Sequence, residues 1–540
     1  MWTQNWRETC WSQLDQAWDM IIVGGGITGA GLLRESSRLG LRCLLVEQRD
    51  FAWGASSRSS KLVHGGLRYL KDGQFRIARD AIRQRQHLLK EFDDLVTPVG
   101  FLFPTYKGKS PGPWGYRVVL SLADMIAAKR DHQHYHADAF HLLVPHIPQE
   151  GLTGGFRIIE AQTDDARLVL RVLREAVAAS GIAMNYVKAE ELLWQQNQVV
   201  GLRLRDQVQN RAAEVYAKVV VNATGAWADQ LREQLAVPAR LRPLRGSHLI
   251  FPYWRLPVPQ AFSWTHPIDH RPLSLLPWQG ITLVGTTDSD NDLPLDDEPA
   301  IRPEEVAYLM AALEEQFPSL QLTLDDVMAT FSGVRPVIGT GLADPSKESR
   351  EHVIWEEKGL LTVTGGKLTT FSLMVLEALQ ALGTHFPHIS LPAPALNPIH
   401  DNEPNLAQVA GATARRRLQG RYGADTGNLI ALARPGELAA IPGTEILWAE
   451  LRWAAHAEGV VHLDDLLLRR VRLGLLLPEG AKAHLPAIRT LCQMELGWTD
   501  ERWEQEEKAY LALIHKSYSL PDRSTIPDWH RPLKAARNHK

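Results

Sequence analysis

Short apolar runs and a helix-like stretch alternate over the first fifty residues. Residues 20–23 form a four-residue apolar run, which is typical of a strand buried in a parallel sheet. A glycine-rich turn follows, then a helical stretch that extends through Arg38, and then a second apolar run at 43–46. The pattern predicts a strand–helix–strand unit whose two strands are parallel.

The turn after the first strand has a glycine spacing with a known physical use. Gly24, Gly26 and Gly29 form G-x-G-x-x-G, with Thr28 just before the last glycine. Glycines at these positions permit a tight turn and bring the backbone close to a pyrophosphate at the helix N-terminus. Glu47 ends the second strand, where an acid can bind ribose hydroxyls. The sequence therefore predicts dinucleotide binding.

The later pattern predicts the rest of the architecture. A helix at 164–180 and strands at 199–204 and 217–222 lead into Ala223-Thr224-Gly225. Such a strand, far from the first turn, indicates an FAD-binding domain built from discontinuous segments; an ordinary buried strand and turn is the alternative. Residues 245–300, rich in Pro, Trp and short apolar runs, predict an antiparallel sheet with a turn at 285–288.

Proline marks the expected boundary to a third region. Residues 386–404 contain five Pro and predict a linker, and helical patterns follow it, for example at 447–456 and 463–475. The predicted fold class is α/β, with a discontinuous Rossmann-like FAD-binding domain, an antiparallel-sheet substrate domain and a C-terminal all-helical domain. The predicted domains are an N-terminal Trp-rich extension at 1–18, the interleaved FAD and substrate domains at 19–385, and the helical domain at 405–540. Within the interleaved pair, the substrate part is expected at about 80–150 and 245–335.

Composition and charge exclude several classes of protein. The 59 Lys and Arg nearly balance the 62 Asp and Glu, so we expect no nucleic-acid partner. The three Cys stand too far apart for a disulfide framework or a zinc ribbon, which favours a reduced compartment. No segment offers the roughly 20 apolar residues of a membrane span, and we expect no secretory signal.

A histidine cluster needs a separate interpretation. His132, His134 and His136 would share one side of a strand, as metal ligands do, and His141 follows nearby. Asp131 and Gln133 stand among them in polar, loop-like sequence, and we expect no acidic or Cys partner for a metal site. We therefore predict a solvated loop and no metal site.

Glycines beside single polar residues recur after Glu47. The loop from Ser56 to Gly65 can carry its backbone beneath a flavin, and Gly366-Lys367-Leu368 offers backbone donors and a cation to an anion or a flavin edge. Four motifs then stand in order: SSKLVHGGLRYL at 59–70, RGSH at 245–248, SGVRP at 332–336 and GGKLTT at 365–370. With them the chain resembles the FAD-dependent, quinone-linked glycerol-3-phosphate dehydrogenases, strongly over residues 18–385 and more weakly beyond.

The resemblance implies oxidation of sn-glycerol 3-phosphate to dihydroxyacetone phosphate, by hydride transfer to FAD and onward passage of the electrons to a membrane quinone. It implies His248 as the base and Arg335 as a second catalytic residue, which either stabilises the C2 oxygen or helps bind the phosphate. The implied substrate contacts are Arg68, Tyr69, Lys367 and Thr369. The implied cofactor contacts are Gly24, Gly26, Thr28, Gly29, Glu47, Ser56, Ser57, Ser59, Lys61, His64, Gly65, Ala223, Thr224, Gly225, Gly366, Lys367 and Leu368.

Three alternatives stay open on the sequence. The same half-reaction could deliver electrons to O₂, as in a glycerol-3-phosphate oxidase. The same fold could oxidise another small hydroxy or amino acid. A flavin-bearing subunit or binding module without catalysis is the third alternative. One departure from the family pattern lies near the expected flavin, because Ala55 stands where the family usually has Thr.

A quinone acceptor lies in the bilayer, so a protein without a span must contact one leaflet. Residues 101–130 mix apolar and aromatic side chains with cations, the composition of an interfacial helix, and the resemblance supports this segment as the contact. Residues 1–18 hold four Trp on a moderately amphipathic helix, which could anchor the chain or pack on its own surface or on a second subunit. We expect a cytoplasmic protein, peripheral on the inner face of a bacterial cell membrane, and the resemblance allows a homodimer. The basic tail at 531–540 is a further candidate lipid contact.

Overall fold

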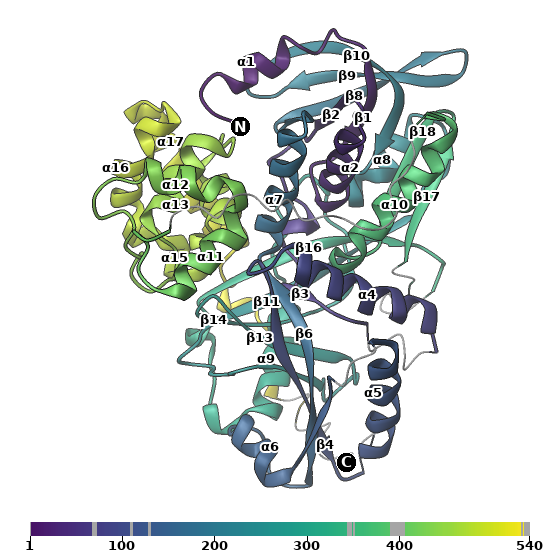
Figure 1. Cartoon of the computed structure of the whole chain (residues 1–540). Helices are drawn as coiled ribbons and strands as arrows, with labels where there is room; N and C mark the ends of the chain where they lie inside the picture. The colour runs from purple at the N-terminus through teal and green to yellow at the C-terminus, as the bar shows by residue number, and fades with distance from the viewer. Residues whose placement is uncertain are drawn as a thin grey trace.

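The computed structural model describes residues 2–66, 73–108, 112–127, 131–342, 348, 351–388, 406–530 and 533. Figure 1 shows two β-sheet regions, one above the other, with a group of helices against the left side. The upper region carries the N-terminal strands, and the lower one carries β4, β6, β11 and β13. The helices on the left come from the C-terminal part of the chain.

The first sheet contains the predicted strand–helix–strand unit. Its order is β17 (His352–Glu357), β18 (Leu360–Gly365), β10 (Arg211–Asn222), β1 (Trp18–Val23), β2 (Cys43–Val46) and β7 (Ile182–Met184). β1 is parallel to both β10 and β2, as predicted. The first half of β10 pairs with β9 (Gln198–Asp206), which in turn pairs with β8 (Val187–Gln195).

Helices cover this sheet. α2 (Ile27–Arg38) contacts α7 (Asp165–Ala178) and α10 (Phe371–Ala381). Their buried side chains join those of the central strands in one core, which includes Ile22, Leu45 and Val221. Because β1 and β2 are buried on both faces, they read as continuous apolar runs rather than alternating ones.

The second sheet is the expected antiparallel one. Its main order is β15 (Ser289–Asp290), β11 (Leu241–Pro252), β14 (Ile281–Gly285), β13 (Pro272–Trp278), β12 (Ala261–Thr265), β4 (Val96–Tyr106), β6 (Leu152–Thr163) and β3 (Leu62–Val63). β16 (Ala329–Ile338) pairs along the other edge of β11, and the β12–β4 pair is parallel. α9 (Pro303–Gln316) packs on one face, where it shares a core with β11, β12 and β13.

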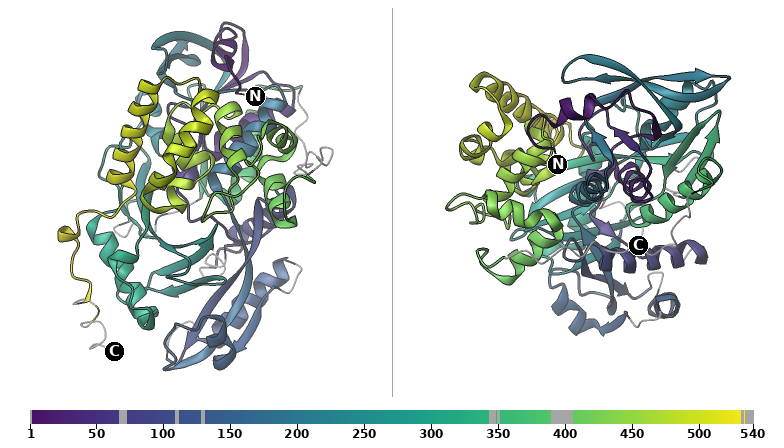
Figure 2. Two further views of the ribbon diagram at one scale, coloured as in Figure 1. Left: turned by 90° about the vertical axis from the view of Figure 1, so that its left-hand side faces the viewer. Right: turned by 45° about the horizontal axis from the view of Figure 1, so that its top comes forward.

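The C-terminal region is helical, as predicted. Its longer helices are α11 (Ala412–Tyr422), α13 (Trp448–Ala457), α16 (Leu485–Leu496) and α17 (Asp500–Ser517). In Figure 2 they lie together on one side of the molecule, and the last segment runs down toward the second sheet. There the Trp529 indole donates to Glu314 of α9 at 3.1 Å. The predicted linker lies outside the described residues from 389 onward.

The single helix predicted over 463–475 is wrong in detail. The chain forms a π-helical segment, Asp465–Arg470, and a separate short helix α14 (Leu473–Leu476). Between them Arg472 adopts a φ of 64°, in the left-handed region. The helix breaks because Arg470 and Arg472 both turn inward: Arg470 pairs with Asp50, and Arg472 with Asp165.

The interpretation of the histidine cluster also needs a correction. Residues 133–136 form strand β5 (Gln133–His136), which pairs with β6, so the predicted solvated loop is wrong. The missing acidic partner is Asp124, whose carboxylate lies 2.6 Å from His132 Nδ1. Within the described residues no group of three His, Cys, Asp or Glu side chains could hold a metal ion.

The segment 101–130 divides into a strand and a helix. Its first six residues belong to β4, and the helix α5 spans Pro113–Ala127. Tyr116 packs this helix against Phe156 of the sheet, with ring centroids 5.7 Å apart. On its outer side Trp114, Val118 and Met125 are 63% to 77% exposed. Among the described residues, no helix combines the length and the apolar character that a membrane crossing requires.

The N-terminal segment packs on its own chain. Trp2 and Trp18 are buried, and the Trp2 indole donates to the Ala183 carbonyl at 2.9 Å. Arg7, in the short helix α1 (Trp6–Trp11), donates to the Asn185 carbonyl at 2.8 Å. Of the two interpretations of this segment, the contacts favour docking on the protein itself.

Candidate functional site

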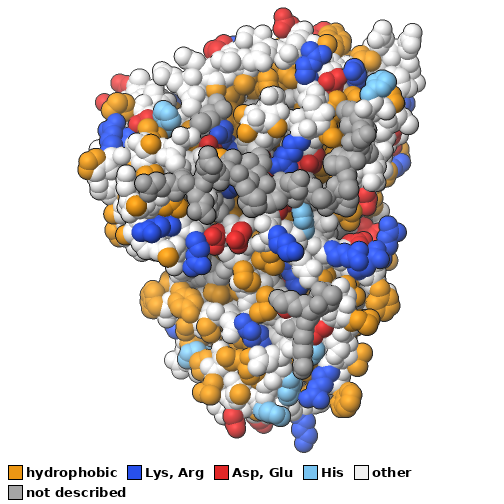
Figure 3. Space-filling model, viewed as in Figure 1, with side chains coloured by type: hydrophobic (Ala, Val, Ile, Leu, Met, Phe, Trp, Pro, Cys, Tyr) orange, Lys and Arg blue, Asp and Glu red, His pale blue; other side chains and the backbone are white. Residues whose placement is uncertain are grey.

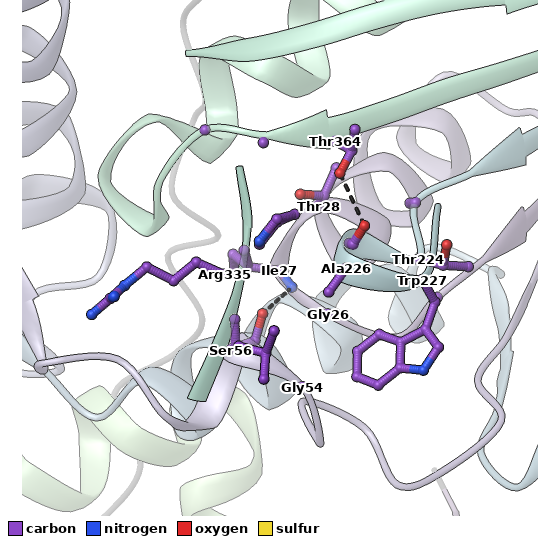
Figure 4. A pocket seen from close by; sticks show the side chains of 18 of the residues that line it. Gly26, Ile27, Thr28, Gly54, Ser56, Thr224, Ala226, Trp227, Arg335 and Thr364 are labelled. Atoms are coloured by element: carbon purple, nitrogen blue, oxygen red, sulfur yellow. Dashed lines mark hydrogen bonds between the residues drawn. The ribbon is translucent and has the colours of Figure 1, made fainter. Parts of the chain in front are cut away.

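A cleft of about 570 Å³ opens where the carboxyl ends of β1, β10 and β18 face β16 of the second sheet. Figure 4 shows side chains from the glycine turn, from the Ser56 loop, from the Thr224–Trp227 turn and from β16 pointing into it. In doubly wound α/β folds, ligands bind beyond the carboxyl ends of the parallel strands. The position of the cleft follows from the strand order alone.

The glycine turn forms the floor of the cleft at the start of α2. Gly24 has a φ of +114°, and a Cβ on it would lie 2.5 Å from the Ala223 carbonyl oxygen. A Cβ on Gly29 would lie 1.9 Å from the Gly24 oxygen, so this glycine lets the helix pack against the turn rather than lining the cleft. The cofactor contact predicted for Gly29 stays a prediction.

Two polar side chains hold the turn in place. The Ser56 hydroxyl accepts from the Ile27 N–H at 3.0 Å, at the first residue of α2. Glu47 accepts from the Gly25 N–H at 2.7 Å and from the Arg49 N–H at 2.8 Å. Burial raises the pKa of the Glu47 carboxyl. Glu47 lines the cleft with Gly24, Gly26, Thr28 and Ser56.

A second wall comes from segments far along the chain. Ala223, Thr224 and Gly225 follow β10 and line the cleft, and the Gly225 carbonyl accepts from the Thr364 hydroxyl at 3.1 Å (Figure 4). Gly366, Lys367, Leu368 and Thr369 also line it, just before α10. Gly366 has a φ of +68°, and a Cβ on it would lie 2.4 Å from the Met374 sulfur. The strand ends thus bring together two glycine turns separated by some 140 residues.

The loop predicted to lie beneath a flavin divides into two sets. Ser56, Ser59 and His64 line the cleft. Ser57, Lys61 and Gly65 are not part of this lining, and their predicted cofactor contacts stay predictions. The Lys61 ammonium, fully buried, lies 2.8 Å from both oxygens of Asp165, because a buried charge needs a partner. Burial lowers the pKa of Lys61 to about 7.

Gly65 and Ser57 make their contacts through the backbone. The Gly65 N–H donates to Glu160 at 2.6 Å, and a Cβ on Gly65 would meet Arg85 at 2.9 Å. The Ser57 carbonyl accepts from Lys61 at 2.8 Å and from Arg472 of the helical domain at 2.8 Å. No local pattern indicated Arg472, because it lies 415 positions from Ser57.

Arg335, on β16, lines the cleft, and so do the cations Arg58, Lys188 and Lys367. The Arg335 guanidinium donates to Asp288 at 3.1 Å and to the Thr286 hydroxyl at 2.9 Å. These two partners come from the predicted turn at 285–288, whose role the sequence did not indicate. They fix the direction in which Arg335 points, while a quarter of its side chain stays exposed.

His248 lies behind the cleft rather than in its lining. Its ring stacks on Phe331 at 4.5 Å between centroids, and its Nε2 is 2.8 Å from the Ser60 hydroxyl. Burial, followed by the nearby charges of Arg335 and Lys61, holds the pKa of His248 well below the usual histidine value. Ser60 does line the cleft, and sequence reasoning had not singled it out. Arg68 and Tyr69, the other predicted substrate contacts, lie outside the described residues.

The two glycine turns, the N-terminus of α2 and Glu47 suit a dinucleotide. Close backbone approach and free room above the glycines accommodate a pyrophosphate, which the helix N-terminus attracts. The adjoining cations of Arg335 and Lys367 suit a small anion beside it. The residues that are present therefore fit FAD together with an anionic substrate.

Comparisons with known proteins agree with this geometry. Residues 19–372 match the family of FAD dependent oxidoreductases, and residues 401–503 match the C-terminal domain of alpha-glycerophosphate oxidase. An aerobic glycerol-3-phosphate dehydrogenase of Bacillus subtilis (strain 168) is 37% identical over 365 residues, which are 66% of this chain and 65% of that protein. A protein of the same name from Staphylococcus aureus (strain USA300) is 32% identical over 481 residues, 84% of this chain and 86% of that one.

Solved structures show the same relation. The X-ray structure of the glycerol-3-phosphate dehydrogenase from Bacillus halodurans complexed with FAD has a TM-score of 0.79 and 27% identity, covering 96% of this chain and 98% of that one. An L-alpha-glycerophosphate oxidase from Mycoplasma pneumoniae, with a TM-score of 0.56 and 17% identity, shares the fold. The chain belongs to the FAD-dependent oxidoreductases and, within them, to the FAD-dependent glycerol-3-phosphate dehydrogenase family.

Proposed function

We propose that this protein oxidises sn-glycerol 3-phosphate to dihydroxyacetone phosphate with bound FAD and passes the electrons to a membrane quinone. The observation that carries the proposal is the meeting of three features at one cleft. These are the FAD-type glycine turns, the cations Arg335 and Lys367, and the serine that contacts His248. The names of the relatives support the same substrate.

When bound, FAD supplies the acceptor for the two electrons of the oxidation. In this chain the glycine turn at 24–29, Glu47, Ser56 and the turns at 223–225 and 366–368 would hold it. Ser59 and His64 line the same cleft from the loop above. Glu47 accepts one hydrogen bond from the glycine turn, at the Gly25 N–H, and one from the Arg49 N–H of its own loop, so the carboxylate is already held in place.

The substrate's phosphate would bind between Arg335, Lys367 and Thr369. A phosphate dianion favours fixed cations in a partly enclosed site, where charged hydrogen bonds are about twice as strong as neutral ones. Asp288 and Thr286 hold the Arg335 guanidinium by two hydrogen bonds, so little side-chain entropy is lost when it binds an anion. Arg68 and Tyr69 would complete the set.

His248 would accept the proton of the C2 hydroxyl. Its lowered pKa keeps the imidazole neutral near pH 7, which is the form that a general base requires. A positive neighbour, Arg335, adds to this effect and would also stabilise negative charge developing on the C2 oxygen.

The quinone part of the proposal needs a membrane contact, and α5 supports it. Its exposed Trp114, Val118 and Met125 lie on a helix that also exposes Arg117. In Figure 3, hydrophobic and basic side chains lie together at the lower right, where Figure 1 places α5. Apolar and aromatic side chains among cations suit the headgroup boundary of one leaflet.

A glycerol-3-phosphate oxidase is the second candidate, because residues 401–503 match the C-terminal domain of alpha-glycerophosphate oxidase. Anaerobic addition of sn-glycerol 3-phosphate to the holoenzyme should bleach the visible flavin band. A flavin that stays oxidised would refute both candidates and would support the binding-module alternative. Mixing the reduced enzyme with a quinone or with oxygen then separates the two, since rapid reoxidation by oxygen with peroxide release would favour the oxidase.

A further inference from the structure

We propose that the Ser60 hydroxyl is a catalytic group that carries the proton from the substrate to His248. The inference rests on the proposed function and names a residue that completes its site. Without such a link, the predicted base has no route to the cleft, because His248 is buried and does not line it. Ser60 lines the cleft and is 2.8 Å from His248 Nε2.

Ser60 is held between two anchored neighbours. Asp165, fully buried at the start of α7, accepts from the Ser59 N–H at 2.9 Å and from the Ser59 hydroxyl at 2.7 Å. The same carboxylate lies 2.8 Å from the Lys61 ammonium on the other side of Ser60. Because both flanking residues are tied to one carboxylate, the backbone of Ser60 has little freedom to turn its hydroxyl away.

The base is fixed just as firmly. His248 lies in β11, paired with Gly285 of β14 on one side and with Phe331 of β16 on the other. A Cβ on Gly285 would lie 2.3 Å from the imidazole Cδ2, so the glycine provides the space in which the ring lies. Stacking on Phe331, at an interplanar angle of 9°, sets the orientation of the ring.

These positions define the proton path. With its proton on Nδ1, the neutral imidazole presents Nε2 as the acceptor for the Ser60 hydroxyl. During the oxidation the C2 hydroxyl gives its proton to the Ser60 oxygen, and Ser60 gives its own proton to Nε2. Bound FAD would take the C2 hydrogen together with both electrons of its bond, which would leave the ketone and an imidazolium. Ser60 is thereby restored within the same step.

Single-turnover flavin reduction in the anaerobic holoenzyme tests this path. Wild-type enzyme must first be reduced by sn-glycerol 3-phosphate, because failure there would refute the proposed function and not the role of Ser60. Ser60→Ala should then reduce about 10²–10⁴-fold more slowly at saturating substrate, the usual value of general acid–base catalysis. The affinity of the oxidised enzyme for dihydroxyacetone phosphate should change less than threefold. The shift of the flavin spectrum on binding measures this affinity.

The pH profile separates a proton path from a structural role. In wild-type enzyme the reduction rate should fall at acid pH as His248 becomes protonated, and His248→Asn should remove that fall. The charged groups that face His248 are Arg335 and Lys61, and neither is altered in these variants. Ser60→Ala should also lose this fall of the rate at acid pH (the acid limb of the profile), because its residual rate no longer depends on His248. A slower variant that keeps the acid limb would overturn the proposal.

Two further variants complete the test. Ser263→Ala is the control: it removes the hydroxyl of a buried serine in β12, which donates to the Leu273 carbonyl at 2.7 Å, and it should keep the wild-type rate. Ser60→Thr keeps a hydroxyl, so its reduction rate should still fall at acid pH. This variant replaces Ser60→Ala in the test if Ser60→Ala fails to hold FAD. The double variant Ser60→Ala/His248→Asn should be no slower than the slower single variant. Losses that multiply in the double variant would overturn the shared path.

Discussion

Asp50 joins the helical domain to the loop that forms one wall of the cleft, and its charge should be worth several kcal/mol of stability. The carboxylate is fully buried and accepts from Arg470 at 2.7 and 2.8 Å and from Arg469 at 2.5 Å. Asn185 donates to it at 3.0 Å. Asp50→Asn keeps the size of the side chain but removes the charge that these two arginines face.

The magnitude follows from what the arginines retain. Arg469 keeps Asp464 and Asp465, whereas Arg470 keeps the Glu458 carbonyl at 3.0 Å and loses its carboxylate partner. Breaking a buried ion pair by removing one partner costs about 3–5 kcal/mol, because it leaves an uncompensated charge. At a urea m-value of about 3 kcal/mol per M, that cost moves the unfolding midpoint down by roughly 1–2 M.

Equilibrium urea unfolding, followed by tryptophan fluorescence, measures the effect. Asp19→Asn is the matched control, because Asp19 pairs at 2.8 Å with Lys218, whose side chain is 65% exposed. An exposed pair of this kind is worth about 0–1 kcal/mol. If Asp50→Asn moves the midpoint no further than Asp19→Asn, the buried network does not stabilise the contact between the domains.

Acid should act on the same group. The two arginines lower the pKa of Asp50 from 3.8 to about 2, against the cost of its burial. A carboxyl whose pKa is lowered by folding stabilises the fold above its unfolded pKa, and that contribution disappears as the pH falls from 3.8 toward 2. It amounts to about 2–3 kcal/mol at 1.36 kcal/mol per pKa unit. Asp50→Asn should lack this part of the acid sensitivity in a pH series of the unfolding midpoint.

Three other outcomes are expected. Gly29→Ala should prevent retention of FAD during purification, because its Cβ would lie 1.9 Å from the Gly24 oxygen, whereas Gly383→Ala, with open space around the added atom, should keep the flavin spectrum. Lys367→Ala should mainly raise KM, and Arg335→Ala should mainly lower kcat. Each change should be roughly 10–150-fold, since one charged hydrogen bond is worth about 1.5–3 kcal/mol. Wild-type values of KM and kcat in steady-state kinetics would contradict the placement of these two side chains. Replacing Trp114 and Val118 by Ser should reduce co-sedimentation of the protein with anionic liposomes. Deletion of residues 2–16 should lower the midpoint of thermal unfolding and leave co-sedimentation unchanged. The reverse pattern would favour residues 1–18 as the membrane anchor.

Much of the expected FAD site could be predicted from the sequence because its residues act through local geometry. Gly24, Gly26 and Glu47 lie within one strand–helix–strand unit, where the spacing of a few residues sets their positions. The turn at 223–225 was recognisable because a buried strand ends there. The predicted solvated loop at 132–136 failed for the opposite reason: its residues pair with the edge of β6, and such pairing leaves no mark on a short polar segment.

Local reasoning could not separate the residues of this loop that line the cleft from those that lie behind it. Ser57, Ser59 and Lys61 follow one another within five positions, yet only Ser59 lines the cleft. Lys61 turns away because Asp165, 104 positions later, offers a buried carboxylate that neutralises it. The contact between Ser60 and His248 of β11 likewise joins residues 188 positions apart.

By itself, the sequence determined the class of the protein: an FAD-type nucleotide unit, an antiparallel sheet, a helical C-terminal region and the motifs of one family. These depend on periodicity and on glycine spacing, which act over a few residues. Only the tertiary structure decided which side chains meet, since Asp50 and Arg470 come together across 420 positions. A buried charge must find its partner wherever the fold supplies one, because the cost of leaving it alone in a low-dielectric interior exceeds what most other single contacts contribute.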